Sequence, residues 1–343
     1  MDVNTTNVIV GSLSGPLRVL YGSAVILACI LGITGNGLVI LSIATTPKLR
    51  TSHNAFVFNL SIANLLLSVF TMPFYATAIL AEGWPLSPSL CRLQIELSLN
   101  LWQVSVLTLA AVATNRYLLV AKSAETYSRF CGFKQIAVIL FLVWLEGLSM
   151  SLLAEFVIEV DIRYVPEFSS CALNPWHSPS NHFITALISI LVMTVMIIIP
   201  VQYFRVLLVV RASRQRVGRA VGMELSTAGQ QQNGPRRACP NCNLPGPAGV
   251  TKEEIKLIKM FILLSLVYTI SYLPISIVYL FVAIFPVLIR GARFGAFVLS
   301  IAPAVNPVVY AWMNRGIRKA CYRLLRCKRM VTSPRLERQL EQA

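Results

Sequence analysis

Long apolar segments without charge dominate the chain, and short polar segments separate them. Five of these segments lie between residues 18–48, 53–82, 96–116, 259–290 and 293–315. Two more cover about 183–204 and about 135–156, the second interrupted by Glu146 and Glu155. Each is long enough to cross a bilayer, which takes about 20 helical residues. Because lipid offers the backbone no hydrogen-bonding partner, the pattern predicts an all-α membrane protein with a bundle of seven transmembrane helices.

Composition and charge agree with this pattern. The 343 residues are 56% hydrophobic and only 13% charged, whereas a soluble domain carries roughly 25% charged residues. Of the 30 lysines and arginines, 25 lie at the end of the third segment, in loops after odd-numbered segments or in the tail. Since cytoplasmic loops are rich in basic residues, the N-terminus is predicted outside and the tail in the cytoplasm. The net charge of +16 is then a topology signal that also attracts anionic lipid. It does not indicate nucleic-acid binding.

The topology divides the chain into three regions. Residues 1–18 form an extracellular N-terminus with a glycosylation acceptor at Asn4 and no visible cleavable signal peptide. Residues 19–313 form the seven-helix domain, with a flexible cytoplasmic loop at about 214–250. Residues 314–343 begin with a short amphipathic juxtamembrane helix and continue as a polar tail. A second acceptor pattern at Asn59 falls inside a span and is interpreted as chance.

The eight cysteines fall into groups by compartment. Only Cys91 and Cys171 lie on the outer side, where oxidising conditions favour a disulfide over two free thiols. The Cys-Pro-Asn-Cys motif at 239–242 stands alone in the cytoplasmic loop, and zinc needs four ligands, so no metal site is predicted. Cys321 and Cys327 follow the last span in a basic amphipathic context, which suits palmitoylation; unmodified thiols are the alternative.

Several motifs recur in a fixed order along the helices. They are Gly35-Asn36, Asn59-Leu60-Ser61-Ile62-Ala63-Asn64, Cys91 placed 25 residues before Arg116, Asn115-Arg116-Tyr117, Trp144, Pro274 and Asn306-Pro307-Val308-Val309-Tyr310. In this order and spacing the chain resembles the rhodopsin-like (class A) G-protein-coupled receptors over nearly its whole length. The resemblance implies a plasma-membrane receptor without a cofactor, which is not an enzyme. It implies an extracellular small-molecule ligand, a heterotrimeric G protein, arrestin and a receptor kinase as partners.

Two departures from the common pattern suggest a subgroup. Asn115 stands where most members have aspartate, and Ser271-Tyr272-Leu273-Pro274 stands where most have Cys-Trp-x-Pro. Both features are similar to those of the melatonin and medium-chain fatty-acid receptors. They are also similar to those of the invertebrate orphan receptors typified by trapped-in-endoderm and moody.

The resemblance places a switch at the cytoplasmic ends of the helices. A charge such as Arg116 inside the membrane is costly unless it is paired, so it indicates function. Glu254, 20 residues before Pro274, is at the family position that pairs with this arginine and would clamp helix three to helix six. The alternative is an arginine that snorkels to the headgroups.

Asn115, Tyr117, Asn306, Pro307 and Tyr310 complete the expected switch. Helix five has two possible alignments: Pro200 places Leu208 at the family's tyrosine position, whereas the Tyr203-x-Arg205-Val206 match uses Tyr203. The second is favoured, because Tyr203 could then meet Arg116 and Tyr310 in the active state.

A neutral polar cluster is expected in the core. Asn64 replaces the aspartate that coordinates sodium in most family members, and the cluster comprises Asn36, Asn64, Ser105 and Asn306. Without a carboxylate a hard cation loses its strongest ligand, so sodium is predicted to have little effect on agonist affinity.

The expected ligand pocket lies beneath the loop held by Cys171. Its predicted lining is Tyr75, Ser98, Leu99, Trp102, Tyr272, Tyr279, Phe297 and Ser300. Ser98 replaces the aspartate of amine receptors, and Ser300 replaces the retinal-binding lysine of opsins, so a neutral or amphiphilic ligand is favoured. For each aromatic residue plain helix packing is the alternative.

Charged residues near the pocket leave roles open. Arg92 or Arg163 at the rim could bind a carboxylate head. Glu146 and Glu96 are either proton relays or ligand partners, or they are hydrogen-bonded neutral acids.

A channel or secondary transporter is the competing class. No internal repeat and no charged midplane pathway supports it. No catalytic motif supports a membrane enzyme.

Overall fold

Residues 13–212, 252–282 and 284–326 are described by the structure, a computed structural model. Asn4, the loop at 214–250 with its cysteine pair, and Cys327 lie outside this part. Within the described residues, seven helices are long and apolar enough to cross a membrane. This confirms the predicted seven-transmembrane bundle.

The elements occur in simple chain order. The spanning helices are α1 (Gly15–Thr45), α2 (Ser52–Leu66) continued by α3 (Met72–Ala81), α4 (Pro88–Ala121), α6 (Phe133–Leu153), α7 (Ser178–Met193) continued to residue 212, α9 (Lys252–Phe281) and α10 (Ala292–Met313). Shorter elements are α5 (Ala124–Cys131), α11 (Arg315–Leu325), the strands β1 (Ile162–Val165) and β2 (Ser170–Leu173), the 3₁₀ turns Pro47–Leu49 and Pro286–Gly291, and the π turns Leu67–Thr71, Ala154–Ile158 and Thr194–Ile198.

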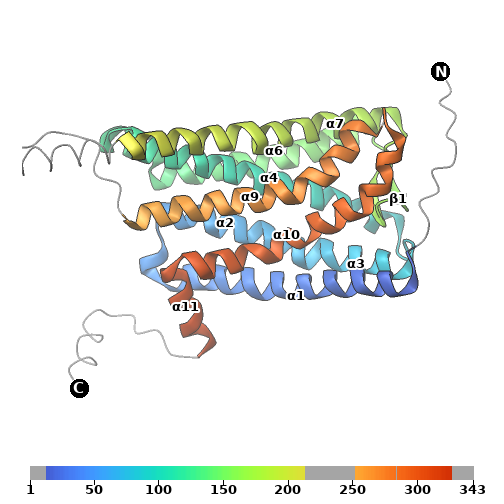
Figure 1. Ribbon diagram of the computed structural model, residues 1–343, viewed down its shortest axis with the longest axis horizontal. Coiled ribbons are helices and arrows are strands. Elements are labelled where there is room, and N and C mark those ends of the chain that lie inside the picture. The colour runs from blue at the N-terminus through green and yellow to red at the C-terminus, as the bar shows by residue number, and fades with distance from the viewer. Residues whose placement is uncertain (1–12, 213–251, 283, 327–343) are drawn as a thin grey trace, which may run out of the picture.

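The long helices lie side by side along the longest axis of the molecule (Figure 1). At one end the antiparallel hairpin of β1 and β2 pairs Tyr164 with Cys171 and lies across the helix ends. At the other end α11 turns away from the bundle. These are called the hairpin end and the α11 end below.

Proline shapes both the start and the interior of the spans. α1 begins at Gly15, four residues before the expected start at residue 19, because Pro16 suits a first helical turn, where its missing N–H costs no bond. Pro73 is the second residue after the π turn Leu67–Thr71, and Pro307 lies inside α10. Each removes one backbone hydrogen bond, so these spans bend locally.

The short helix after the last span matches the predicted juxtamembrane helix. Asn314 caps α11, since its Oδ1 accepts a hydrogen bond from the Ile317 N–H at 3.1 Å. Ile317 and Ala320 are buried against the bundle, whereas Arg315 and Lys319 are exposed. The helix is therefore amphipathic with its basic side outward. Cys321 is half-buried and its Sγ lies 3.2 Å from the Ser42 Oγ of α1.

Candidate ligand pocket and coupling site

A cavity lies inside the bundle beneath the hairpin. The space between its lining atoms is about 930 Å³ when the solvent-filled opening is included. Seven of the eight predicted pocket residues line it: Tyr75, Ser98, Leu99, Trp102, Tyr272, Tyr279 and Ser300.

Phe297 is the exception among the predicted residues. Its ring lies 4.4 Å from that of Tyr21 on α1, and its neighbour Ala296 lines the cavity instead. The prediction was wrong by one position. Because successive residues of a helix are rotated by about 100°, the side chain of Phe297 lies on a different face of α10 from that of Ala296.

The cavity is uncharged but not uniformly apolar. No charged residue occurs among the described residues that line it. The Tyr75 hydroxyl, the Tyr272 hydroxyl and Gln94 Oε1 are buried and have no hydrogen-bond partner within the described part of the chain. Buried polar atoms are normally satisfied, so these three atoms are available to a ligand.

The hairpin covers the cavity and is fixed from two sides. The predicted disulfide between Cys91 and Cys171 is confirmed and ties β2 to the start of α4. Phe168, in the turn between the strands, stacks on Tyr279 of α9 with ring centroids 5.1 Å apart.

Arg293 fixes the hairpin to α10, a role that the sequence analysis missed. Its Nε donates to the Ser169 Oγ at 2.7 Å, and Nη2 donates to the Pro166 carbonyl at 3.0 Å. Burial raises the pKa of the nearby Tyr164 above its ordinary value, while the positive charge of Arg293 opposes this rise. Of the two rim arginines proposed as carboxylate binders, Arg163 is paired with Asp161 at 3.5 Å.

Deeper in the bundle, the polar core contains a tyrosine that was not predicted. The Tyr268 hydroxyl donates to Asn64 Oδ1 at 3.1 Å and accepts from Asn306 Nδ2 at 3.0 Å. Tyr268 is 2% exposed and stacks on Tyr272 with centroids 6.0 Å apart. The side chain therefore links the floor of the cavity to Asn64 of α2 and Asn306 of α10.

The other two predicted core residues bond differently. Asn36 Nδ2 donates to the Gly32 carbonyl at 2.8 Å and to the Pro303 carbonyl of α10 at 3.1 Å. The Ser105 hydroxyl donates to the Leu101 carbonyl of its own helix at 2.8 Å. All four predicted residues are fully buried, and Tyr268 bridges Asn64 and Asn306 directly.

At the α11 end, Arg116 is completely buried. Its guanidinium carbon lies 5.5 Å from the centre of the Phe261 ring on α9. This geometry contradicts the snorkelling alternative, because the charge lies against a ring and not at the surface. Asn115 is 4% exposed beside it, and Arg205 lies over the Tyr117 ring at 5.9 Å. Glu254 is in the first turn of α9, but its side chain lies outside the described part.

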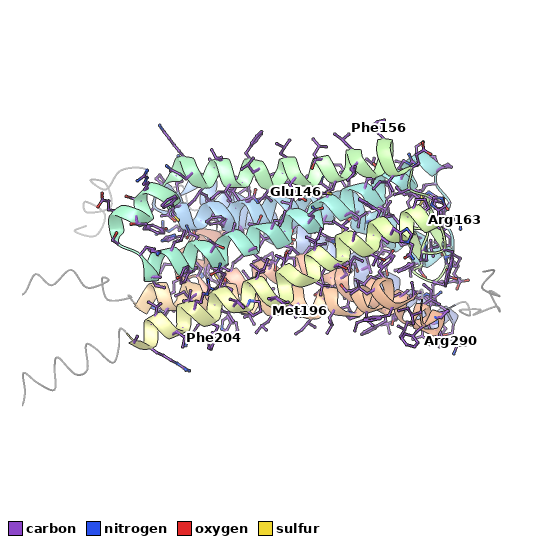
Figure 2. The ribbon with its side chains drawn as sticks, turned by 90° about the horizontal axis from the view of Figure 1, so that it is seen from above. Glu146, Phe156, Arg163, Met196, Phe204 and Arg290 are labelled. Carbon is purple, nitrogen blue, oxygen red and sulfur yellow. A yellow bond between two sulfur atoms is a disulfide. The ribbon has the colours of Figure 1, made fainter. Side chains whose placement is uncertain are left out.

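The burial of side chains on the fifth span, α7 and its continuation to residue 212, distinguishes between the two alignments of that helix. Tyr203 is 5% exposed, whereas Leu208 is 48% exposed. Tyr203 therefore faces the interior, as do the fully buried Tyr310 and Arg116. Figure 2 shows Phe204, the next residue, pointing away from the bundle.

Glu146 lies on the fourth span about midway along the length of the bundle (Figure 2) and is half-buried. Its carboxylate accepts a short hydrogen bond from Gln103 of α4. Asn59 is also explained, since it accepts from Trp144 Nε1 at 2.8 Å and donates to Thr108 at 2.9 Å. It is buried, in agreement with a chance glycosylation pattern.

Residues 35–310 match the family model described as 7 transmembrane receptor (rhodopsin family). The chain belongs to this family. It is a multi-pass membrane receptor and not an enzyme, and family membership gives it a G protein and an extracellular ligand as partners.

The relatives of this rhodopsin-family receptor differ in the ligands that their names state. The tachykinin-like peptides receptor 99D of Drosophila melanogaster is 26% identical over 314 residues, 88% of this chain and 55% of that receptor. The mouse (Mus musculus) melatonin receptor type 1B is 25% identical over 312 residues, 89% of this chain and 78% of that receptor. Melatonin receptors thus occur among the relatives, as expected, but similar identities to other classes leave the subgroup a prediction.

The fold of the receptor is also that of a solved structure. Squid rhodopsin superposes with a TM-score of 0.75 at 17% identity, covering 94% of this chain and 90% of that chain. This likeness shows the fold. At the pocket Ser300 supplies only a hydroxyl, which donates to the Phe297 carbonyl at 2.7 Å.

Proposed function

We propose that this receptor lies in the plasma membrane with the hairpin end outside, that it binds a neutral or amphiphilic small molecule in the cavity, and that it activates a heterotrimeric G protein when α9 moves away from α4. The basic residues support the orientation, since most of those outside the spans belong to the segments that follow odd-numbered spans and to the tail. Arrestin and a receptor kinase are further proposed partners at that end.

The burial of Arg116 carries the proposal. Arg116 belongs to α4, and Phe261 of α9 covers it, so an outward movement of α9 would uncover the guanidinium. A G protein that binds the uncovered arginine stabilises the open form, and a ligand that favours that form shifts the equilibrium in the same direction. Tyr203 and Tyr310, both buried, would complete the surface that is then exposed.

The cavity supports the proposed ligand class. An uncharged lining excludes strong recognition of a charged head, because a buried charge needs a partner. Gln94 Oε1 accepts a donor, whereas the Tyr75 and Tyr272 hydroxyls serve either role. A ligand with an apolar body and one or two hydrogen-bonding groups would satisfy them.

Nucleotide exchange on purified G proteins tests the coupling. The receptor in lipid nanodiscs should accelerate exchange on at least one heterotrimer, and Arg116→Ala should abolish it. Arg129→Ala, an exposed basic residue on α5, is the matched control and should retain activity. Equal exchange by the Arg116 variant in a well-folded sample would refute the proposal.

A screen of neutral and amphiphilic compounds by thermal shift, followed by arrestin recruitment, tests the pocket. For a hit, Gln94→Leu or Tyr272→Phe should weaken binding about tenfold, since one hydrogen bond is worth about 0.5–1.5 kcal/mol. Phe297→Leu lies outside the cavity and should leave affinity unchanged. Ion flux through receptor-containing liposomes would instead support the channel or transporter class.

A further inference from the structure

Within the described residues, three buried polar atoms of the cavity lining have no hydrogen-bond partner. They are Gln94 Oε1, the Tyr75 hydroxyl and the Tyr272 hydroxyl. Each of the three residues is at most 6% exposed. Buried polar groups in folded proteins are normally hydrogen-bonded, so these atoms indicate where a bound molecule would place its own polar groups.

The serine and threonine hydroxyls of the cavity lining are used differently. Each already donates a hydrogen bond of 2.7–3.1 Å to a main-chain carbonyl. Because their hydrogens are engaged within the protein, these hydroxyls offer no free donor to a ligand. The five residues are Thr71, Ser98, Ser170, Ser276 and Ser300.

Gln94 and Tyr272 lie at different depths of the cavity. Arg116 of α4 and Phe261 of α9 face each other near the α11 end. Gln94 precedes Arg116 by 22 residues, and Tyr272 follows Phe261 by 11 residues. At about 1.5 Å per residue they lie about 33 Å and about 16 Å nearer the hairpin end. The long arginine side chain covers part of the difference, so about 10–16 Å separates Gln94 from Tyr272 along the bundle.

Tyr75 also lies nearer the hairpin end than Tyr272. The Tyr268 hydroxyl bonds to Asn64, and both α3 and α9 run towards the hairpin end from this level (Figure 1). Tyr75 follows Asn64 by 11 residues, whereas Tyr272 follows Tyr268 by four. These intervals correspond to about 16 Å and about 6 Å of helix. Tyr75 therefore belongs to the upper part of the cavity, as Gln94 does.

The walls between the two levels are apolar. On α4, Ile95 and Leu99 line the cavity between Gln94 and Trp102. The fifth span contributes the opposite wall with Ile184, Leu187, Ile188 and Leu191. A polar group held at this height would lose its hydration, because these side chains provide no hydrogen bond in return. The cavity thus has polar contacts at the top and at the floor and an apolar middle.

We propose that the cavity binds an elongated neutral ligand with a hydrogen-bonding group at each end. The upper group donates to Gln94 Oε1 beneath the hairpin, and the lower group bonds to the Tyr272 hydroxyl. The inference rests on the proposed function and narrows its ligand class. An amphiphile with a single polar head would leave one of the two atoms without a partner.

Straight-chain alcohols are suitable probes, because their only polar groups are the terminal hydroxyls. An extended chain advances about 3.5 Å for every three bonds. The terminal hydroxyls of decanediol are therefore about 13 Å apart, which matches the spacing, whereas those of hexanediol are only about 8 Å apart. Decanol has the length of decanediol and one hydroxyl. Each probe is compared with itself between receptor variants, so differences in hydrophobicity among the probes cancel.

Equilibrium binding of the tritiated probes to the full chain in lipid nanodiscs tests the proposal, with binding to empty nanodiscs subtracted. Gln94→Leu should raise the Kd of decanediol about tenfold, and Tyr272→Phe should do the same, since each removes one hydrogen bond. The Kd of decanol and the Kd of hexanediol should respond to no more than one of the two variants. Phe297→Leu lies outside the cavity and should change none of the three.

A decanediol Kd that responds to only one of the two variants, or to neither, would overturn the proposal. Gln94→Met removes the amide and keeps the length of the side chain, so the upper contact is still tested if Gln94→Leu does not fold. The same conclusion follows if decanol or hexanediol responds to both variants as decanediol does, because two polar ends at the matched distance would then not be needed.

Ala296→Phe separates this inference from the proposed ligand site, because it adds bulk to the cavity wall. It should block all three probes. If it does so while decanediol responds to a single variant, the cavity is the ligand site and only the two-ended pattern fails. If no probe binds saturably, or if Ala296→Phe leaves binding unchanged, the proposed ligand site fails together with the inference.

Discussion

The phenolic hydroxyl of Tyr268 donates a hydrogen bond to Asn64 Oδ1 at 3.1 Å, which ties α9 to α2. The same hydroxyl accepts a hydrogen bond from Asn306, the residue before Pro307 in α10. One side chain therefore joins three spans at the level below the cavity. Movement of α9 away from the bundle must break both bonds.

Tyr268→Phe removes this bridge without changing the size of the ring. The free energy of unfolding should fall by about 1–3 kcal/mol, because Asn64 and Asn306 lose a buried partner. Ligand-independent nucleotide exchange should rise, because α9 is less restrained. Tyr272→Phe, one turn later, is the control and should change neither quantity, since the Tyr272 hydroxyl has no partner within the described residues. Thermal unfolding and basal exchange measure the two effects, and a variant that matches the wild type in both would exclude the bridge as a restraint.

Sodium should not affect agonist affinity, as predicted from Asn64. The structure adds a reason: the Tyr268 hydroxyl is hydrogen-bonded to Asn64 Oδ1, so a cation would have to displace it and would find no carboxylate there. Agonist binding measured with millimolar NaCl and with choline chloride at the same ionic strength should agree. Asn64→Asp supplies a carboxylate and is the positive control. A sodium-dependent affinity in the wild type would show that the amides suffice.

The spans were predictable from the sequence because lipid imposes the same requirement on every one of them. The ends of the spans were less predictable from the sequence. The fifth helix was expected at about 183–204, but the structure has it from Pro179 to Ala212. A helix that leaves the hydrocarbon continues through the headgroup region and beyond. Polar residues are compatible with a helix there, so the first polar residue does not mark the end of the helix. Apolar pattern alone therefore reports the membrane-embedded part.

The pocket was predictable where motifs fixed the rotation of a helix. Seven of the expected residues line the cavity because positions counted from Arg116, Pro274 and Pro307 keep the same face. Tyr268 was missed because a tyrosine within an apolar run resembles packing, and its bonds depend on the rotation of three helices at once. The contact between Arg293 and the hairpin was missed since the path of a loop is not encoded in a periodic pattern.

Gly295→Ala should destabilise the receptor. A Cβ at Gly295 of α10 would lie 2.8 Å from the backbone nitrogen of Ile275 and 3.0 Å from its Cα, so α9 and α10 must separate, at a cost of about 1–3 kcal/mol. Gly37→Ala is the control, because nothing lies within 4 Å of its Cβ position. There alanine should be neutral or stabilise helix α1 by about 0.5–1 kcal/mol. Melting temperatures in one detergent compare the two, and equal shifts would contradict the packing argument.

Tyr203 should support ligand-stimulated exchange, whereas Leu208 should not. Tyr203 is buried and faces the interior, and Leu208 is half exposed to lipid. Tyr203→Phe removes only the hydroxyl that is proposed to meet Arg116 in the active state, so stimulated exchange should fall while folding is kept. Leu208→Ala should leave exchange unchanged. The opposite result, a loss with Leu208→Ala alone, would favour the alignment on Pro200.

Glu254→Ala should raise ligand-independent exchange. Arg116 is buried beneath α9, and Glu254 is in the first turn of that helix, so removing its charge would weaken the resting attachment of α9 to α4. A coupling of about 1–3 kcal/mol corresponds to about a 5–150-fold change in the equilibrium. A carboxylate in a first turn also stabilises the helix through its dipole, and Glu253→Ala removes the same contribution from a position about 100° away. Exchange should therefore rise with Glu254→Ala and stay at the wild-type rate with Glu253→Ala. If both variants raised it equally, the helix terminus rather than a pairing with Arg116 would hold the resting state.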